Sequence, residues 1–420
     1  MSSSAKILRL HRGLDGNSRV SKKVESLRGS SLVIDDLAII THYLHASEPK
    51  YRQHYKKLLN SRGLIDVIEW FEKTNFASRE IFPPVGEPSF KFIDLFAGIG
   101  GMRLAMQRAG GRCVFSSEWD DSARMTYFAN FGEIPFGDIT AIANEKRPSL
   151  EIPSHDVLVA GFPCQAFSIA GFKGGFDDTR GTLFFNLARV IQDHKPQAFL
   201  LENVKGLVSH DRKKTFKRIL EVLQKELEPG YHVKWKIVNA KNFGVPQNRQ
   251  RIFIVGFRNR AAFERFEFPS GRETQRRIAH IREKEVVDTK YYLSQQYFET
   301  LVRHRDRHAA KGNGFGFEIK ADTDFANAII VGGMGRERNL IVDKRRKTFK
   351  PTTNIKSEVN ELRLRRMTPR EWARLQGFDE RFEIPVSDAQ AYKQFGNSVA
   401  VPAVAATAKA IAKALGVLRR

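Results

Sequence analysis

The sequence predicts an α/β protein organised around a doubly wound, mostly parallel sheet, and three observations lead to that prediction. Between residues 91 and 256, short apolar runs typical of buried strands alternate with amphipathic stretches typical of helices. Glycine-rich and polar motifs follow directly after several of these runs, at the positions where such sheets bind ligands. Hydrophobic residues make up 41% of the chain, which is enough for a sizeable core. Alternating strands and helices imply a sheet covered by helices on both faces.

The N-terminal part, residues 1–89, is predicted to be a helical extension that is separate from the sheet. Its segments 35–44 and 64–72 carry apolar residues at mixed i, i+3 and i+4 spacing. A proline-rich stretch at 83–88 then breaks the chain. A DNA-contacting helical module and a simple helical cap both fit this pattern, and the sequence does not distinguish between them.

Residues 90–256 are expected to supply most of the sheet. The predicted strands are the apolar runs at 92–96, 113–115, 156–160, 198–201 and 252–255. The predicted helices between them lie at 101–109, 121–130, 183–193 and 212–227. This alternation is the basis of the parallel-sheet prediction.

Basic residues dominate the chain and are not confined to one tail. The 420 residues carry a formal net charge of +23, which favours a polyanionic partner, and nucleic acid is the commonest one. A basic protein unrelated to nucleic acid remains the alternative on charge alone. Residues 257–362 lose the alternation of strands and helices and contain 22 Lys and Arg against 15 Asp and Glu, a net charge of +7. They are predicted to form a second, smaller, basic domain.

The C-terminal segment, residues 363–420, returns to helix and is expected to complete the sheet domain. Thr368 suits a helix N-cap, Pro369 suits the first helical position and Glu371 completes a capping box. The last helix, about 402–416, is rich in alanine and is expected to pack on the sheet.

Several classes of protein are disfavoured by what the chain lacks. No stretch approaches 18 uninterrupted apolar residues, so no transmembrane helix is expected. The N-terminus leads to no apolar signal-peptide core, so a cytoplasmic location is expected. The two cysteines, Cys113 and Cys164, cannot supply a disulfide framework or a four-ligand zinc site.

A glycine-rich turn follows the first predicted strand, in Asp94-Leu-Phe-Ala-Gly-Ile-Gly-Gly101. Glycines let the backbone approach a ligand closely, although a tight structural turn would use them too. The spacing differs from the GxGxxG of dinucleotide sites, which argues against a nicotinamide oxidoreductase. Glu118 and Asp138 are predicted to follow the next two strands, where acids suit a ribose diol and an adenine amino group. Each acid alone would also suit a helix cap.

Two further motifs carry groups for chemistry. Cys164 lies in Gly161-Phe-Pro-Cys-Gln-Ala-Phe-Ser168, on a loop just past the strand 156–160, and a loop position favours a reactive thiol over a structural one. Glu202, in Leu201-Glu-Asn-Val204, follows another buried strand. Beside a sulfur nucleophile, its carboxyl group can hold or protonate a ring nitrogen. Helix capping is the alternative role for Glu202.

Two polar motifs complete the set. Arg249 and Arg251 precede the strand 252–255, and an arginine that points into a cleft can donate to a carbonyl oxygen. Plain surface charge is the alternative. Gln394-Phe-Gly-Asn-Ser-Val399 opens the final helix, where its hydroxyl and amide groups either complete a pocket or cap the helix.

Taken in order, these five blocks resemble the motifs of the bacterial DNA (cytosine-5)-methyltransferase family, over most of residues 91–420 apart from much of the basic insert. The resemblance implies a catalytic domain formed by 90–256 and 363–420, which binds S-adenosylmethionine, and a target-recognition domain at 257–362. A cleft between the two domains would hold double-stranded DNA. The resemblance assigns cofactor-lining roles to Phe96, Gly98, Gly100, Gly101, Glu118, Trp119, Asp138, Ile139, Pro163, Leu183, Asn397, Ser398 and Val399.

The resemblance also implies a mechanism that needs no metal. Cys164 would add to carbon 6 of cytosine and so activate carbon 5 for methylation. Glu202 would hydrogen-bond the ring N3 and amino group, Arg251 would bind O2, and Arg249 would support the site or the cysteine loop. The target carbon is inaccessible in a stacked duplex, so base flipping is implied.

The DNA contacts are predicted less directly. Gln165 and Ser168 lie on the loop that would close over the DNA. The insert lacks the Thr-Leu type of dipeptide often seen in the family's recognition domain. Arg336, Arg338 and Asn339 are the candidate base-reading residues, because Arg reads guanine and Asn reads adenine in the major groove. Phosphate contacts and structural roles are the alternatives for these three.

The resemblance predicts a monomer that acts on DNA in the bacterial cytoplasm, at the nucleoid. A cognate restriction endonuclease acting on the same site is a predicted partner, and an orphan methyltransferase is the alternative. An RNA cytosine-5 methyltransferase and a non-catalytic DNA-binding protein on the same fold are the competing functions.

Overall fold

The protein is described by a computed structural model. The structure describes residues 34–65, 68, 80–83, 87–142, 152–163, 183–312, 316–331, 336–350 and 358–418.

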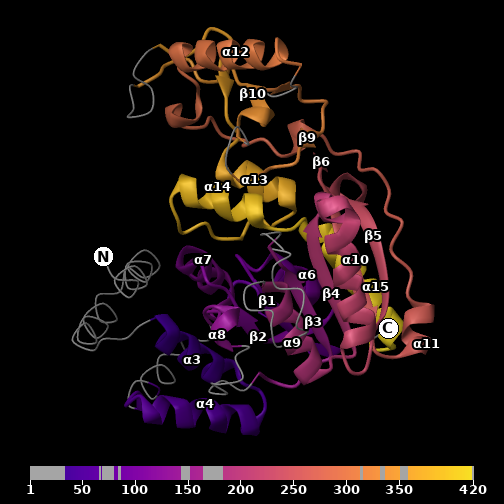
Figure 1. The fold of residues 1–420 in the computed structure, drawn as a ribbon. Helices are drawn as coiled ribbons and strands as arrows, with labels where there is room; N and C mark the ends of the chain where they lie inside the picture. The colour runs from indigo at the N-terminus through magenta and orange to yellow at the C-terminus, as the bar shows by residue number, and fades with distance from the viewer. Residues whose placement is uncertain are drawn as a thin grey trace.

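A six-stranded sheet forms the centre of the molecule, in the order β2-β1-β3-β4-β7-β5 (Figure 1). Neighbours among the first four strands pair in parallel, whereas β7 runs antiparallel to both β4 and β5. The predicted α/β class with a mostly parallel sheet is confirmed. The strands are β1 (Phe90–Leu95), β2 (Gly111–Ser117), β3 (Val157–Gly161), β4 (Ala198–Val204), β5 (His232–Asn239) and β7 (Gln250–Phe257).

Strand β5 has no counterpart among the predicted strands. It forms an edge of the sheet, and most of its residues are exposed or half-buried, including Lys234 and Lys236. A solvent-facing edge strand needs no continuous apolar run, so the pattern that revealed the central strands is missing here.

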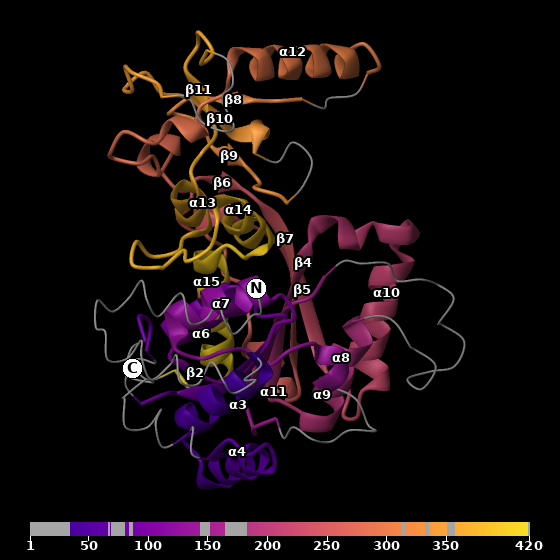
Figure 2. The ribbon, with the colours of Figure 1, turned by 90° about the vertical axis from the view of Figure 1, so that its left-hand side faces the viewer.

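Helices cover both faces of the sheet (Figure 2). Alternate side chains of β3 enter opposite cores: Val157 and Val159 face one cluster, whereas Leu158 and Ala160 face the other. Helices α6 (Gly101–Arg108), α11 (Arg260–Arg265) and α15 (Val401–Leu415) contribute to the first cluster. Helices α9 (Leu183–His194) and α10 (Lys214–Glu221) contribute to the second. The expected helix at 212–227 is divided into η6 (His210–Lys213), α10 and the π-helical segment η7 (Val222–Glu226).

The N-terminal extension is helical as predicted, but it is not separate from the sheet. Its described helices are α3 (Ile34–His45) and α4 (Pro49–Ser61). Apolar residues of both helices share one core with residues of β1 and β2, among them Phe115. The prediction of a separate extension is therefore wrong, because the apolar face of α3 is buried against the six-stranded sheet.

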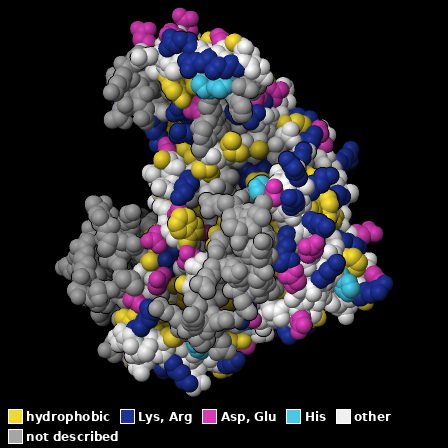
Figure 3. Space-filling model, in the orientation of Figure 1, with side chains coloured by type: hydrophobic (Ala, Val, Ile, Leu, Met, Phe, Trp, Pro, Cys, Tyr) yellow, Lys and Arg dark blue, Asp and Glu magenta, His cyan; other side chains and the backbone are white. Residues whose placement is uncertain are grey.

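The basic insert forms a smaller domain above the sheet in Figure 1, with its own apolar core. It contains α12 (Gln295–Ala309) and the three-stranded sheet of β8 (Ile319–Lys320), β10 (Leu340–Val342) and β11 (Leu364–Arg365). The short pair of β6 (Gln247–Asn248) and β9 (Ala326–Asn327) joins it to the lower part. Figure 3 shows the surface hollowed on the left between the two parts.

The C-terminal segment returns to the domain of the six-stranded sheet through α13 (Pro369–Gln376), α14 (Asp388–Asn397) and α15. The predicted start of α13 is confirmed, because Thr368 caps the helix and forms a capping box with Glu371. One described stretch, Asp388–Leu415, is long and apolar enough to cross a membrane by length and composition, but it spans two helices and 61% of its apolar window is buried. Its apolar residues belong to the core beneath the six-stranded sheet.

Candidate active site

The antiparallel strand β7 brings the two arginines to the edge where the parallel strands end. Arg251 lies near the start of β7 and pairs in register with Val204, the last residue of β4. Glu202 precedes Val204 by two residues and is paired with Phe253. Because β7 runs in the opposite direction to β4, residues that begin β7 lie beside residues that end β4.

An ion pair between the half-buried Arg251 and the buried Glu202 forms at this edge. The Nε atom of Arg251 lies 3.3 Å from Oε1 of Glu202. Burial raises the pKa of the Glu202 carboxyl above its ordinary value, although the charges of Arg251 and Arg249 lower it in part. A Cβ atom added at Gly161 would lie 3.8 Å from Oε2 of Glu202, so the end of β3 borders the same carboxyl group. A carboxyl group whose pKa is raised can donate a proton or a hydrogen bond near neutral pH.

The predicted nucleophile follows the described part of this edge in the sequence. Cys164, Gln165 and Ser168 are outside the described residues, so their predicted roles remain predictions. The chain reaches them through β3 and the half-buried Pro163.

Asn203 is a contributor that the motif analysis did not assign. Its buried amide donates to the carbonyl oxygen of Phe162 at 3.0 Å, and its Oδ1 accepts from the backbone N–H of Val204 at 2.7 Å. It therefore fixes the backbone two residues before Cys164 relative to the strand that carries Glu202. The signal was available in the Glu-Asn-Val motif, since Asn is rare in a buried strand unless its amide is bonded.

Arg249 is buried and bonded to backbone carbonyls of distant segments. Its guanidinium donates to the carbonyl oxygens of Ile329 at 2.7 Å, Gly396 at 3.2 Å and Ser398 at 2.7 Å. Burial lowers its pKa to about 9, which leaves it charged at neutral pH. Arg249 thus joins β7, the insert and the Gly-Asn-Ser-Val turn. The predicted role of Arg249, support of the site or of the cysteine loop, stays a prediction, and its described partners lie in the insert and in that turn.

Replacing Arg249 with lysine is expected to lower the free energy of unfolding by about 2–4 kcal/mol, because one ammonium group cannot reach all three buried carbonyls. Urea denaturation measures this. Arg265→Lys is the matched control, since that arginine binds the single carbonyl of Ala414 on α15. An Arg249→Lys loss no larger than the control's would contradict the supporting role.

The predicted cofactor acid is held by backbone donors at the ends of β1 and β2. Glu118 Oε2 accepts from the N–H of Gly98 and Oε1 from the N–H of Asp120, each at 2.8 Å. The carboxylate therefore keeps further lone pairs for a ligand. Next to it, the Trp119 side chain is 73% exposed, which is unusual for a large aromatic ring. The turn itself is left-handed at Phe96 (φ 55°), Gly98 (φ 55°) and Gly100 (φ 84°).

The far end of the chain closes the same site. A Cβ atom added at Gly101 would lie 2.7 Å from Oγ of Ser398 and 3.0 Å from Cγ2 of Val399. The glycine turn and the Gly-Asn-Ser-Val turn are therefore in contact, although about 300 residues separate them. Asn397, in the second of these turns, is exposed at the end of α14.

The remaining predicted cofactor residues have mixed positions. Asp138 is exposed and caps the short helix α8 (Ile139–Ile142), where its Oδ1 accepts from the N–H of Thr140 at 2.9 Å. The prediction that it follows a strand is wrong, because Phe136 forms only an isolated bridge with Ser117. The Ile139 side chain is buried in the core, whereas Leu183 is half-buried at the start of α9.

The base-reading predictions need one correction. Asn339 is fully buried, and its side chain accepts from the N–H of Asn327 at 2.8 Å, so the structure contradicts a base-reading role for it. Arg338 is exposed and paired with Glu318, with Nη2 at 3.0 Å from the carboxylate. Arg336 lies over the ring of Tyr392. Within the described ranges, no group of three or more His, Cys, Asp or Glu side chains is arranged to hold a metal ion.

Comparison with known proteins decides the family. The profile of C-5 cytosine-specific DNA methylases matches residues 90–413. The chain belongs to this family. It is 59% identical over 345 residues to the type II methyltransferase M.HpaII of Haemophilus parainfluenzae, covering 81% of this chain and 95% of that protein. It is 37% identical over 414 residues to the DNA-cytosine methyltransferase of Escherichia coli K12, covering 85% and 86%.

Solved structures support the fold. The Entamoeba histolytica methyltransferase EhMeth superimposes with a TM-score of 0.58 at 19% identity, covering 77% of this chain and 98% of that one. Dnmt2 of Schizosaccharomyces pombe gives 0.55 at 20% identity, covering 78% and 99%. The protein is a DNA cytosine-5 methyltransferase on a methyltransferase fold, and the RNA and non-catalytic alternatives are not favoured.

Proposed function

We propose that the protein methylates carbon 5 of a flipped cytosine through a covalent adduct with Cys164, using S-adenosylmethionine. The observation that carries this proposal is the Glu202–Arg251 pair, which lies at the sheet edge that also bears the predicted cofactor turn. An acid with a raised pKa beside a guanidinium suits the ring N3 and O2 of cytosine.

The residues at the glycine turn fit the proposed cofactor. A Cβ atom added at Gly98 would meet nothing within 4 Å, so the turn opens onto free space. Glu118 retains acceptor capacity for a ribose diol, and the exposed ring of Trp119 offers a face for adenine. When bound, the cofactor supplies an electrophilic methyl group.

Each protein group then has a defined task. The Cys164 thiolate forms a bond to carbon 6, and the electron pair of the 5,6 double bond moves toward carbon 5. Glu202 donates a proton or hydrogen bond at N3, which offsets the charge that develops on the ring, and Arg251 holds O2. After carbon 5 has gained its methyl group, loss of its proton restores the double bond and expels the thiolate.

Duplex DNA is proposed to lie in the hollow between the catalytic domain and the insert, where Arg336 and Arg338 remain candidates for contacts with it. On the catalytic side, the segment after β4 presents three exposed cations, Arg212, Lys213 and Lys214. Within the described parts of the chain, none of these three has a recorded acidic partner. Arg212 (φ 51°) and Lys213 (φ 71°) also have left-handed backbone, which is costly for residues other than glycine. Figure 3 shows Lys and Arg side chains gathered over α10, which begins at Lys214.

Replacing Arg212, Lys213 and Lys214 together with glutamine is expected to weaken DNA binding at low salt. Each lost phosphate contact removes about 0.9 from the slope of log K against log salt, so the slope should fall by about 2–3. Fluorescence anisotropy over a salt series measures it. The control replaces the exposed lysines Lys57, Lys409 and Lys413, which lie on α4 and α15. Equal slopes for the two triple variants would refute the contact.

The biological setting is also proposed. The name of the Haemophilus relative favours a restriction–modification system with a cognate endonuclease acting on the same site. A monomer in the bacterial cytoplasm, working at the nucleoid, fits one chain that carries both domains.

Bisulfite sequencing of DNA from a methylation-free host that expresses the protein tests the function directly. Protection of cytosines within one short sequence supports the proposal. A folded protein that protects no cytosine would overturn it.

A further inference from the structure

Helix α3 lies outside the residues that the family profile matches. It nevertheless contacts residues 134–137, which we call the cofactor wall because they lie directly before the predicted cofactor residue Asp138. The profile begins at residue 90, so α3 is an addition to the shared catalytic core. Its contacts converge on one segment, residues 133–137, which leads into Asp138.

Two side chains of α3 hold the backbone of this segment. Oγ1 of Thr41 accepts from the N–H of Ile134 at 3.0 Å, and Thr41 is 1% exposed. Asp35 pairs with Nη2 of Arg124 at 2.7 Å, and Nε of the same arginine donates to the carbonyl oxygen of Pro135 at 2.9 Å. Because Arg124 is almost fully buried, its guanidinium has little freedom to move, and its two bonds link Asp35 to the carbonyl group of Pro135.

The other side of this segment is bonded to the end of β2, beside the cofactor acid. The N–H of Phe136 donates to the carbonyl oxygen of Ser116 at 2.8 Å. The N–H of Glu118 donates to the carbonyl oxygen of Phe136, also at 2.8 Å. Oγ of Ser117 donates to the carbonyl oxygen of Gly137 at 2.7 Å. The segment is therefore held between α3 and Glu118.

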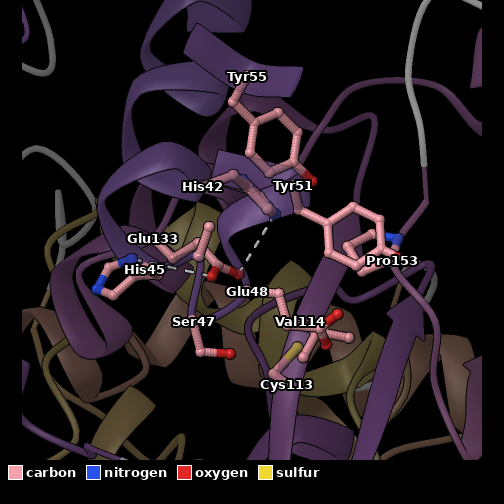
Figure 4. A pocket seen from close by; sticks show the side chains of 11 residues that line it. His42, His45, Ser47, Glu48, Tyr51, Tyr55, Cys113, Val114, Glu133 and Pro153 are labelled. Carbon is pink, nitrogen blue, oxygen red and sulfur yellow. Dashed lines mark ion pairs between the residues drawn. The ribbon is translucent and has the colours of Figure 1, made fainter. Parts of the chain in front are cut away.

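A buried polar centre locks α3 in this place (Figure 4). The His42 ring lies 4.2 Å from the ring of Phe136, centroid to centroid, and its Nε2 is 3.6 Å from Oε1 of Glu133. Glu133 also accepts from Arg103 of α6 at 2.9 Å and from Ser116 at 3.0 Å. A buried carboxylate with these partners permits few alternative positions of the helix.

We propose that α3 positions the cofactor wall: Thr41 and Asp35 hold residues 134–137, and these residues set Glu118 and Asp138 for the ribose and adenine of the cofactor. Thr41 and Asp35 are positioning residues, since each acts on the cofactor site through the backbone of residues 134–137. The inference rests on the proposed cofactor site. It gives the helical extension a task in catalysis that neither a DNA-contacting module nor a simple cap would have.

The test is Thr41→Val in the full-length protein, which keeps the shape and removes the acceptor of the Ile134 N–H. We expect the KM for S-adenosylmethionine and the Kd for S-adenosylhomocysteine, measured by calorimetry, to rise about 5- to 20-fold. The kcat at saturating cofactor and the KM for DNA should change less than about twofold. Thr41→Ser retains the hydroxyl group and should restore the wild-type values.

Two further variants keep the result interpretable. Thr407→Val removes another buried hydroxyl, which donates to the carbonyl oxygen of Ala403 within α15, and it should leave cofactor affinity unchanged. Asp35→Asn alters a side chain that is 59% exposed, so it should fold even if Thr41→Val does not, and it should raise the same KM about two- to threefold.

The outcomes separate this inference from the proposed function. Wild-type protein that binds no S-adenosylhomocysteine would refute the cofactor site itself. Wild-type protein that binds, with Thr41→Val or Asp35→Asn binding equally well, would refute only the role of α3. A parallel loss of kcat, DNA affinity and cofactor affinity would also refute it, because that is the signature of general destabilisation.

Discussion

Cys164→Ala is expected to abolish DNA methylation, with a fall in the single-turnover rate of at least about 10⁴-fold. Without the thiolate no bond to carbon 6 forms, and carbon 5 is too weak a nucleophile to accept the methyl group. Transfer of labelled methyl groups to duplex DNA measures the rate. Mass spectrometry with 5-fluorocytosine duplex and cofactor should detect a trapped adduct in the wild type and none in the variant.

Cys113→Ala is the matched control, because the chain has only these two cysteines. Cys113 is buried in β2, and burial raises the pKa of its thiol to about 12, so it stays protonated and unreactive. The variant should keep wild-type activity and form the adduct. An adduct that survives Cys164→Ala, or that disappears with Cys113→Ala in folded protein, would contradict the assignment of the nucleophile.

Glu202→Gln is expected to lower the single-turnover rate by about 10²–10³-fold, since an amide cannot supply the proton that stabilises charge on the ring. Burial raises the pKa of the Glu202 carboxyl. The protonated form therefore persists to a higher pH than usual, and the wild-type rate should fall as pH rises through the folded-state value. That descending limb should be absent in the variant, because glutamine does not titrate.

The same raised pKa of Glu202 predicts an unusual stability profile. A carboxyl group that binds its proton more tightly in the folded state makes folding less favourable as pH rises from its ordinary value through the folded one. The glutamine variant should therefore be at least as stable as the wild type at pH 7, with the difference vanishing in acid. Glu264→Gln, on the exposed surface of α11, is the control for both profiles. A Glu202→Gln protein that loses activity and stability together would point to a structural role.

The fold class could be predicted because the central strands are buried on both faces. Such strands must be continuously apolar, so Asp156–Ala160 and Ala198–Leu201 stood out in the sequence, and β3 and β4 lie there. Strand β5 was not predicted because it lies at the edge of the sheet, where its solvent-facing side chains need not be apolar. The start of α13 was equally predictable, since the capping bonds of Thr368 and Glu371 are local and need no distant partner.

The roles of individual polar residues could likewise be predicted only where a local sequence pattern fixed their position. Glu118 was identified because it comes directly after strand β2, whereas Glu202, which was predicted to follow a strand, lies inside β4 two residues before its end. Asn339 was misassigned, because its place in a Gly- and Arg-rich stretch says nothing of burial, and its amide is used within the insert. Asn203 was overlooked because its partner, the carbonyl of Phe162, lies 41 residues away in the chain.

The sequence by itself determined the family and the reaction that it implies: the order of the glycine turn, the cysteine, the Glu-Asn-Val strand and the arginine motif resembles that of DNA (cytosine-5)-methyltransferases. Only the tertiary structure decided how distant groups support it. The antiparallel direction of β7 brings Arg251 to Glu202. The Arg249 guanidinium binds the backbone carbonyls of Ile329 and Ser398, 80 and 149 residues away. Helix α3 packs against the segment that lies beside Glu118. These contacts join segments whose separation along the chain carries no periodic signal, so they arise from packing and hydrogen bonding in the folded protein alone.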